Sequence, residues 1–192
     1  MNINLIKNSK SSFLGKNVYF YDEITSTHEF AELYTYLFSN GSLILADMQT
    51  KGKGTKDHSW FTGKGKNIAM TIVLKPHCLV SDLDNLTKLI AESMVTTIYN
   101  LYSIKLSIKD PNDLFYNQRK IGGILTTIHS SNEKVSSLLI SIGFNVNEQN
   151  FPDDIKNIST SLYNEFGTIF NREDIIREFL LVLEKNISFL FL

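Results

Sequence analysis

The sequence predicts an α+β fold, in which a mixed, largely antiparallel sheet carries helices packed on one face. Two observations support this prediction. Segments rich in β-forming residues are concentrated after a long helical segment and do not alternate strictly with helices, as they would in a parallel α/β sheet. Turn-forming segments at 110–113 and 130–132 separate three of these β-rich segments, which is typical of an antiparallel meander.

The first part of the chain contains three predicted strands and one helix. Runs of β-forming residues predict strands at 17–21, 43–48 and 67–74. Ser26 and Glu29 have the spacing of a capping box, so we expect a helix to begin there and to run to about residue 38. The residues of this helix expected to face inward are Phe30, Ala31, Leu33, Tyr34 and Leu37.

A long helix and the meander follow. Ser81 and the residues up to Asp84 form a second capping signal, and apolar residues spaced three and four apart after it predict one buried helix face. These apolar residues are Leu83, Leu86, Ile90, Met94, Ile98 and Leu101. Strands are expected at 105–108, 120–129 and 135–144, with a short extra strand at 114–116. Asn171 is expected to cap a last helix that ends near residue 183.

Length and composition indicate one globular domain, residues 1–192, with no linker and no repeat. The hydrophobic fraction of 43% is enough for a buried core, and the net charge of −1 gives no overall attraction to nucleic acid or to an anionic membrane. No apolar run approaches the roughly 20 residues of a membrane-spanning helix. The N-terminus lacks the apolar core of a signal peptide, and the single cysteine, Cys78, suits a reducing compartment, so we expect the protein in the cytoplasm.

A stretch rich in glycine and lysine follows the second predicted strand. Five lysines, one of them Lys56, and four glycines lie between residues 51 and 66. Glycine lets backbone amides approach a ligand closely and lysine adds positive charge, so phosphate is the natural ligand. The stretch contains neither a P-loop nor a Rossmann fingerprint. Its composition suits a solvated loop equally well, and Trp60, the single tryptophan, is of a type found more often in a core than on a ligand platform.

Two further stretches place polar residues beside predicted strands. Residues 109–113 (K-D-P-N-D) have the composition of a turn, but two carboxylates and an amide beside a lysine also suit Mg²⁺ and a phosphoryl group. Gly122 and Gly123 inside a predicted strand indicate a bulge or a close approach of the backbone to a ligand. Residues 143–145 (G-F-N) close the last predicted strand, where glycine and asparagine usually form a turn. The four histidines lack the spacing of a zinc site, and the sequence has no motif for nucleophilic catalysis.

Together, these stretches resemble the signatures of the biotin protein ligases. The loop of that family reads approximately G-R-G-R-x-G-R-x-W after an upstream glutamine, and Gln49, residues 52–55 and Trp60 occupy those places. The family's K-W-P-N-D, followed seven residues later by the lysine of a K-[LI]-[AG]-G-I-L run, corresponds to residues 109–113 and 120–125. The G-x-N signature of the family corresponds to residues 143–145. Residues 25–28 (T-S-T-H) are similar to a D-S-T-N signature that holds the ureido ring of biotin, and the resemblance covers about residues 18–185.

The sequence departs from the family at several of these places. Lys53 and Thr55 stand where the family has arginines, His28 replaces an asparagine, and Asp110 replaces the tryptophan of K-W-P-N-D. We expect neither an N-terminal helix-turn-helix nor the small C-terminal β-barrel domain of the family in these 192 residues. A repressor role is therefore not expected.

The resemblance implies a ligase that forms biotinyl-5'-AMP from biotin and ATP and transfers biotin to a lysine of a biotin carboxyl carrier protein, an acetyl-CoA carboxylase subunit. It implies ATP and Mg²⁺, with Mg²⁺ at Asp113, and it allows a homodimer through an exposed sheet edge. The implied catalytic residues are Lys120, Asp113 and Lys53. The implied biotin-binding residues are Ser26, Thr27, His28, Gln49, Gly52, Lys53, Gly54, Thr55, Lys120, Gly122 and Gly123. The implied contacts to ATP and to the adenylate are Lys53, Thr55, Trp60, Asn112, Lys120 and Asn145.

Two alternatives stay open at the level of sequence. A lipoate or octanoate ligase shares the fold and an active-site lysine, but the R-R-x-x-G-G-G loop of those relatives is not found here, and Cys78 is not placed for octanoyl transfer. The second alternative is a decayed ligase that binds biotin or nucleotide without catalysis. Asp110, Thr55 and the expected absence of the C-terminal domain favour it.

Overall fold

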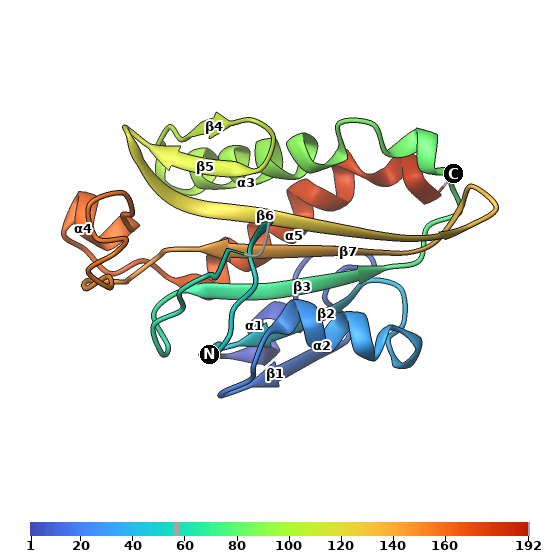
Figure 1. Ribbon diagram of the computed structural model, residues 1–192, viewed down its shortest axis with the longest axis horizontal. Coiled ribbons are helices and arrows are strands. Elements are labelled where there is room, and N and C mark those ends of the chain that lie inside the picture. The colour runs from blue at the N-terminus through green and yellow to red at the C-terminus, as the bar shows by residue number, and fades with distance from the viewer. Residues whose placement is uncertain (56–57, 192) are drawn as a thin grey trace.

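The centre of the molecule is a seven-stranded sheet, seen in a computed structural model that describes residues 1–55 and 58–191 (Figure 1). The strands are β1 (Val18–Tyr21), β2 (Ser42–Ala46), β3 (Ile68–Leu74), β4 (Ser107–Lys109), β5 (Asp113–Tyr116), β6 (Arg119–Ser131) and β7 (Lys134–Phe144). Their order in the sheet is β1-β2-β3-β7-β6-β5-β4. β1 and β2 are parallel, and all other neighbours are antiparallel. The mixed sheet and the antiparallel meander, formed by β4 to β7, are thereby confirmed.

Helices cover much of this sheet. The α-helices are α1 (Ile3–Lys7), α2 (Thr27–Leu33), α3 (Leu86–Tyr102), α4 (Leu162–Phe166) and α5 (Arg172–Asn186), and short 3₁₀ helices are η1 (Thr35–Leu37), η3 (Val80–Leu83) and η4 (Ser188–Phe191). The two long helices, α3 and α5, pack against each other (Figure 1). Asn171 caps α5 as predicted, since its Oδ1 accepts a hydrogen bond of 3.1 Å from the amide of Asp174. None of the described helices combines the length and apolar character needed to cross a membrane.

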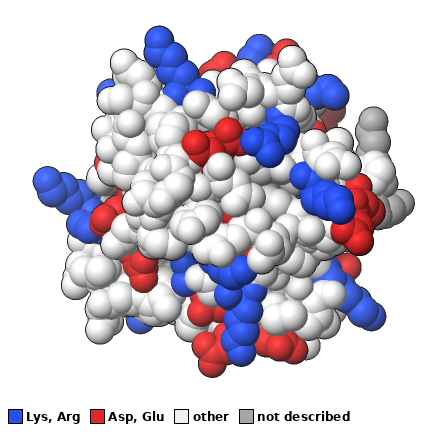
Figure 2. Space-filling view, turned by 90° about the vertical axis from the view of Figure 1, so that its left-hand side faces the viewer, with Lys and Arg blue, Asp and Glu red and all other residues white. Residues whose placement is uncertain are grey.

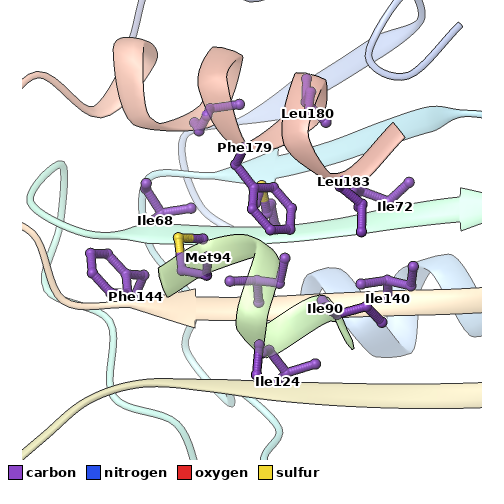
Figure 3. Packing of buried hydrophobic residues seen from close by; sticks show 14 of the residues in the cluster. Ile68, Ile72, Ile90, Met94, Ile124, Ile140, Phe144, Phe179, Leu180 and Leu183 are labelled. Atoms are coloured by element: carbon purple, nitrogen blue, oxygen red, sulfur yellow. The ribbon is translucent and has the colours of Figure 1, made fainter. Parts of the chain in front are cut away.

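The main core lies between the sheet and the pair of long helices. Side chains alternate between the two faces of a strand, so the even-numbered residues of β3, and those of β7 from Leu138 to Phe144, point to this core. Figure 3 shows Ile68, Ile72, Ile140 and Phe144 meeting Phe179 of α5 and its neighbours from α3. The helices α1, α3 and α5 therefore share one face, as predicted, and α2 is the exception to the expectation that the helices pack on one face.

The short helix α2 lies on the opposite face. Its Ala31 packs with Ile44, Val73 and Leu139, which belong to the other side of the same strands. Further along β3 and β7 this face carries polar or small residues instead, namely Thr71, Ser141 and Gly143. Because α2 is short, it leaves this polar part of the face available to the loops that form the site.

The predicted helix that begins at Ser26 ends earlier than expected. The structure ends α2 at Leu33, not near residue 38, and Leu33 and Leu37 are 68% and 62% exposed, so placing these two inward was wrong. The Thr35 hydroxyl donates to the carbonyl of Ala31 at 2.6 Å and so competes with the helical backbone bonds. The chain continues as the 3₁₀ helix η1 instead.

The predicted capping signal at 81–84 was also wrong. Asp82 Oδ2 accepts from the Leu79 amide at 2.8 Å and caps the 3₁₀ helix η3. The long helix α3 begins only at Leu86, after Asn85 in a left-handed conformation with φ 61°. The predicted apolar face is nevertheless confirmed, since its residues from Leu83 to Ile98 are buried.

Candidate active site

A pocket lies on the α2 side of the sheet, where the predicted motifs converge. Its walls come from the start of α2, from the segment after β2, and from the ends of β5, β6 and β7. In Figure 1 the segment between β2 and β3 passes across the sheet toward β6 and β7. The predicted site residues that line the pocket are Thr27, His28, Gln49, Lys53, Gly54, Thr55, Trp60, Asn112, Asp113, Lys120 and Gly123. Stretches more than 90 residues apart in the chain therefore share one cavity.

One end of the pocket is built on the contact between Gln49 and Thr27. The Oε1 atom of Gln49 accepts from the backbone amide of Thr27 at 2.8 Å and from its hydroxyl at 3.1 Å. The backbone amide is always a donor, so it fixes which end of the Gln49 side-chain amide faces α2. Nε2 of Gln49 donates to Thr62 Oγ1 at 3.3 Å. The orientation of Gln49 is therefore determined from both ends.

A line of buried polar groups continues from Thr27 under the pocket. The hydroxyl of Thr71 lies 3.0 Å from that of Thr27 and 2.8 Å from that of Ser141. Ser141 Oγ in turn lies 2.7 Å from Nδ1 of His28, and Nε2 of His28 lies 3.1 Å from the hydroxyl of Thr127. Burial lowers the pKa of His28, and the charge of Lys53 acts in the same direction, while Glu32 opposes it. The imidazole is therefore neutral near pH 7.

The other end of the pocket carries the charged groups. Nζ of Lys120 lies 2.7 Å from Oδ1 of Asp113, and both side chains are only partly exposed. Asn112 Nδ2 donates to the same oxygen at 3.1 Å and to the carbonyl of Ile124 at 3.3 Å. Pairing between β5 and β6 shifts register between Leu114 and Phe115, which brings Asp113 opposite Gly123. The irregular pairing thus places a lysine, a carboxylate and an amide together.

Trp60 covers the strands at the centre of the pocket. Its amide donates to the carbonyl of Gly52 at 2.7 Å, and its ring lies so close to Gly143 that a Cβ there would be 2.2 Å from the ring. Nζ of Lys120 lies 5.8 Å from the centre of the ring, a cation–π distance. Trp60 Nε1 is buried and has no hydrogen-bond partner among the described residues. A buried donor of this kind usually indicates a missing acceptor, such as a ligand atom.

On the face drawn in Figure 2, charge is not concentrated in one sign. Lysine, arginine and acidic side chains are interspersed on the face drawn in Figure 2. Asp110 follows this pattern, since it is 69% exposed and lies 3.6 Å from Lys88. The pocket itself has two lysines in its lining, Lys53 and Lys120, that can attract an anion.

The comparison with known protein families agrees with this arrangement. The model of the biotin/lipoate A/B protein ligase family matches residues 20–147, which include the start of α2, the Trp60 segment, Lys120 and the end of β7. The chain belongs to this family.

Individual relatives confirm the resemblance to the biotin protein ligases. The chain is 35% identical over 180 residues to the bifunctional ligase/repressor BirA of Bacillus subtilis, a match that covers 92% of this chain and 55% of that protein. It is 27% identical to the biotin protein ligase of Homo sapiens over 87% of this chain and 23% of the relative. The biotin protein ligase from Aquifex aeolicus in complex with biotin and ATP has a TM-score of 0.76 at 27% identity, covering 90% of this chain and 71% of that chain. The chain spans about half the length of the curated Bacillus relative.

Several residues that the family resemblance assigns to ligands do not line this pocket. Ser26 is fully buried and caps α2, since its Oγ accepts from the amide of Glu29 at 3.4 Å. Gly52 packs under the carbonyl of Trp60, and Gly122 faces the core, where a Cβ would be 2.8 Å from the ring of Phe144. Strand alternation explains the last result, because neighbouring residues of a strand point to opposite faces and only Gly123 faces the pocket.

Asn145 lies beside the pocket rather than in it. Its Nδ2 donates to the carbonyl of Thr160 at 3.0 Å, and its Oδ1 is buried with no hydrogen-bond partner among residues 1–55 and 58–191. It lines an adjoining pocket together with Trp60 and Lys120. Lys56, one of the lysines of the glycine-rich stretch, lies outside the described residues.

Sequence reasoning missed three polar residues of the strands under the pocket and one, Thr62, of the segment between β2 and β3. Thr71, Ser141, Thr127 and Thr62 make the hydrogen bonds described above, yet none belongs to a motif. A signal was present, because Thr71 and Ser141 interrupt strongly apolar strands at positions that share a face with the pocket. Two buried hydroxyls on one face indicate a polar network there.

Proposed function

We propose that this chain is a biotin protein ligase, which forms biotinyl-5'-AMP from biotin and ATP and then transfers biotin to a lysine of a biotin carboxyl carrier protein. The observation that carries the proposal is that one pocket joins a polar end, at Thr27 and Gln49, to a cationic end, at Lys120. Biotin has the same two ends, a cyclic urea and a carboxylate. The Aquifex and human relatives, which are named as biotin protein ligases, support the assignment.

The polar end of the pocket matches a cyclic urea in hydrogen-bond character. The hydroxyl hydrogen of Thr27 points to Gln49, so this oxygen accepts hydrogen bonds from elsewhere. Nε2 of Gln49 has two hydrogens, of which Thr62 takes one. The pair therefore offers an acceptor and a donor, which a ring N–H and the urea carbonyl satisfy. The dithiolane ring of lipoate has neither group, and this favours biotin over lipoate.

The cationic end suits the reacting groups. Lys120 is placed to bind both the carboxylate of biotin and the α-phosphate of ATP, so that the two anions approach each other. Trp60, Lys53 and Thr55 line the same pocket, and in the proposal they exclude water from it, which protects a mixed anhydride from hydrolysis. Asn145 and the adjoining pocket then belong to the nucleotide. After adenylation, the amine of the carrier lysine attacks the acyl carbon and AMP leaves.

We propose that Mg²⁺ binds together with ATP. Among the described residues, no group of three or more His, Cys, Asp or Glu side chains is arranged to hold a metal. Asp113 provides a single carboxylate, and one of its oxygens is paired with Lys120. This donor set fits Mg²⁺ that is held mainly by the phosphates of ATP, with Asp113 as the protein ligand.

Three further parts of the proposal concern the whole protein. We expect residues 1–192 to act as one catalytic domain in the cytoplasm. We propose a homodimer along β6, since the chain before and within β5 bonds to β6 only as far as Ile124 and leaves the edge from Leu125 onward for another strand. Light scattering at increasing protein concentration tests the dimer. A constant monomer mass would contradict it.

Transfer of biotin is tested with a carrier domain as acceptor. The purified chain, biotin and MgATP are incubated with a biotin carboxyl carrier domain, and the mass of the acceptor is measured. We expect the mass of one biotinyl group on one lysine, and no gain when that lysine is replaced by arginine. Comparable transfer of lipoate would favour a lipoate ligase. Binding of biotin without any transfer or adenylate would indicate a non-catalytic relative.

A further inference from the structure

The buried polar residues under the pocket form a line of contacts from His28 through Ser141, Thr71 and Thr27 to Gln49. Only one direction of hydrogen-bond donation along this line makes every contact a hydrogen bond. Gln49 Oε1 is an acceptor, so the Thr27 hydroxyl must donate to it. The Thr27 oxygen is then an acceptor for Thr71, whose hydroxyl donates to it at 3.0 Å. Because a hydroxyl has one hydrogen, Thr71 must accept from Ser141 at 2.8 Å. The direction of donation therefore runs from Ser141 to Gln49.

This direction determines the proton position on His28. Ser141 uses its hydrogen on Thr71, so at 2.7 Å it must accept from Nδ1–H of His28. Nε2 of the neutral ring then carries the lone pair, and the Thr127 hydroxyl donates to it at 3.1 Å. If Nδ1 were an acceptor instead, each hydroxyl in the line would have to donate its hydrogen in the opposite direction. The Thr27 hydrogen would then turn to Thr71, and its lone pair would face Gln49 Oε1 at 3.1 Å.

We propose that His28 is a positioning residue that sets the hydrogen-bond polarity of Thr27 and Gln49, and thereby makes the pocket selective for a cyclic-urea head group. This inference rests on the proposed function, since it names how the same pocket recognises its substrate. His28 acts through Ser141 and Thr71 over a distance, without being required to touch the ligand. Its essential property is a hydrogen-bond donor at the position of Nδ1.

The charged and titratable groups near His28 do not supply that donor by themselves. They are Glu29, Glu32, Lys53 and His129, and their effects on the pKa of His28 oppose one another. Burial is the largest influence and keeps the ring neutral. A neutral ring has one hydrogen to place, and the direction of the hydroxyl line places it on Nδ1.

Two variants of His28 separate the effect of hydrogen-bond donation at the position of Nδ1 from the effect of side-chain size. The side chains of Asn and Asp have the same size, and both place an atom where Nδ1 stands. The amide of His28→Asn can donate to Ser141. An ionised carboxylate in His28→Asp can only accept, so Ser141 must donate to it, and the direction of donation along the line is reversed. The pKa of a buried carboxyl group is raised, and once protonated the carboxyl group donates again.

Affinity for biotin, measured by titration calorimetry without ATP between pH 5 and pH 8, tests the proposal. We expect His28→Asn to bind biotin within about threefold of the wild type, and His28→Asp to bind at least about tenfold more weakly at pH 8, the effect of one hydrogen bond. The affinity of His28→Asp should recover as the pH falls. Equal affinities of the two variants at pH 8, with both folded, would overturn the proposal.

The matched control is Thr97→Ala, which removes a buried hydroxyl that bonds to Ser93 within α3, on the far side of the sheet. It should lower the melting temperature without changing the affinity for biotin. A change of affinity there as large as in His28→Asp would mean that loss of stability, and not polarity, explains the result.

The wild-type protein provides a test that depends on neither variant nor ligand. Nitrogen NMR of labelled histidine distinguishes the Nδ1–H tautomer from the Nε2–H tautomer. We expect His28 to be the neutral Nδ1–H form at pH 7.5. An Nε2–H form would overturn the inferred polarity. Failure of the wild type to bind biotin would instead overturn the proposed function, and the tautomer would still decide the polarity.

Discussion

Gly143 and Trp60 are in direct contact, and a Cβ on Gly143 would lie 2.2 Å from the ring of Trp60. Glycine is therefore required at this place on β7 by the ring that covers it. We expect Gly143→Ala to displace Trp60, to lower stability by about 1–3 kcal/mol, as overpacking does, and to weaken binding of biotin and ATP. Because Trp60 is the single tryptophan, its fluorescence reports the displacement directly.

Gly123→Ala is the control for that variant. A Cβ at Gly123 would lie 3.4 Å from the same ring, which is close to ordinary contact. Its tryptophan fluorescence should change far less. An emission spectrum of Gly143→Ala identical to the wild type would contradict the account of Trp60.

Lys120 should be the most costly single loss at the site. Removal of a preorganised charge from such a site lowers the rate by about 10²–10³-fold. In this protein Lys120→Ala also leaves Asp113, its partner at 2.7 Å, as an uncompensated negative charge near the phosphates. Adenylate formation in a single turnover measures the effect, with the exposed Lys134→Ala as the control. A folded Lys120→Ala protein with a near-normal rate would assign Lys120 a purely structural role.

The loop that contains Lys53 and Thr55 should hold the adenylate weakly. Arginine offers a rigid set of donors for phosphate, lysine offers a single mobile charge, and threonine offers none. Loss of one charge-assisted contact corresponds to roughly ten- to a hundredfold faster release. Lys66 does not compensate, since it is paired with Glu148 at 3.0 Å. We therefore expect biotinyl-AMP to escape and to modify lysines of a bystander protein.

Mass spectrometry of that bystander protein measures the leak. The double variant Lys53→Arg with Thr55→Arg should reduce the number of modified sites, and Lys64→Arg, an exposed position of the same segment, should not. Modification of the carrier lysine alone by the wild type, with release unchanged in the double variant, would contradict the expectation.

Glu184 should contribute to stability in a way that depends on pH. Burial of this carboxylate would raise its pKa, but hydrogen bonds from Ser11, Ser12 and Phe13 outweigh burial and lower the pKa from 4.5 to about 2. A lowered pKa in the folded state means that the stabilisation is complete above pH 4.5 and is lost as the pH falls toward 2. Glu184→Gln should lower the melting temperature at pH 7 and reduce its fall between pH 5 and pH 3. Parallel curves for the two proteins would contradict this.

The sequence predicted the elements of the fold better than their ends. The meander and the buried face of α3 follow from patterns that repeat over many residues. The end of α2 depends on one hydroxyl, that of Thr35, and the start of α3 on the backbone of Asn85. Local competition of this kind is not visible in a hydrophobic pattern.

The site could be predicted as far as its motifs extend. Gln49 is more than 60 residues away from Asp113 and Lys120 in the sequence, and the family resemblance alone brought them together before the structure placed them in one pocket. The contacts of Ser141 with His28 and Thr71 depend on which strands are neighbours, and that information is absent from any single segment. The same strand geometry turns Gly122 away from the pocket that Gly123 lines.

Exchange of pyrophosphate into ATP tests the central claim most directly, because it reports adenylation without any carrier protein. The account predicts exchange that depends on biotin, with lipoate slower by up to about 10⁴-fold, since a site built to pair polar groups rejects a ring that cannot pair them. Exchange that proceeds equally well with lipoate, or no exchange by folded protein that binds biotin, would contradict it.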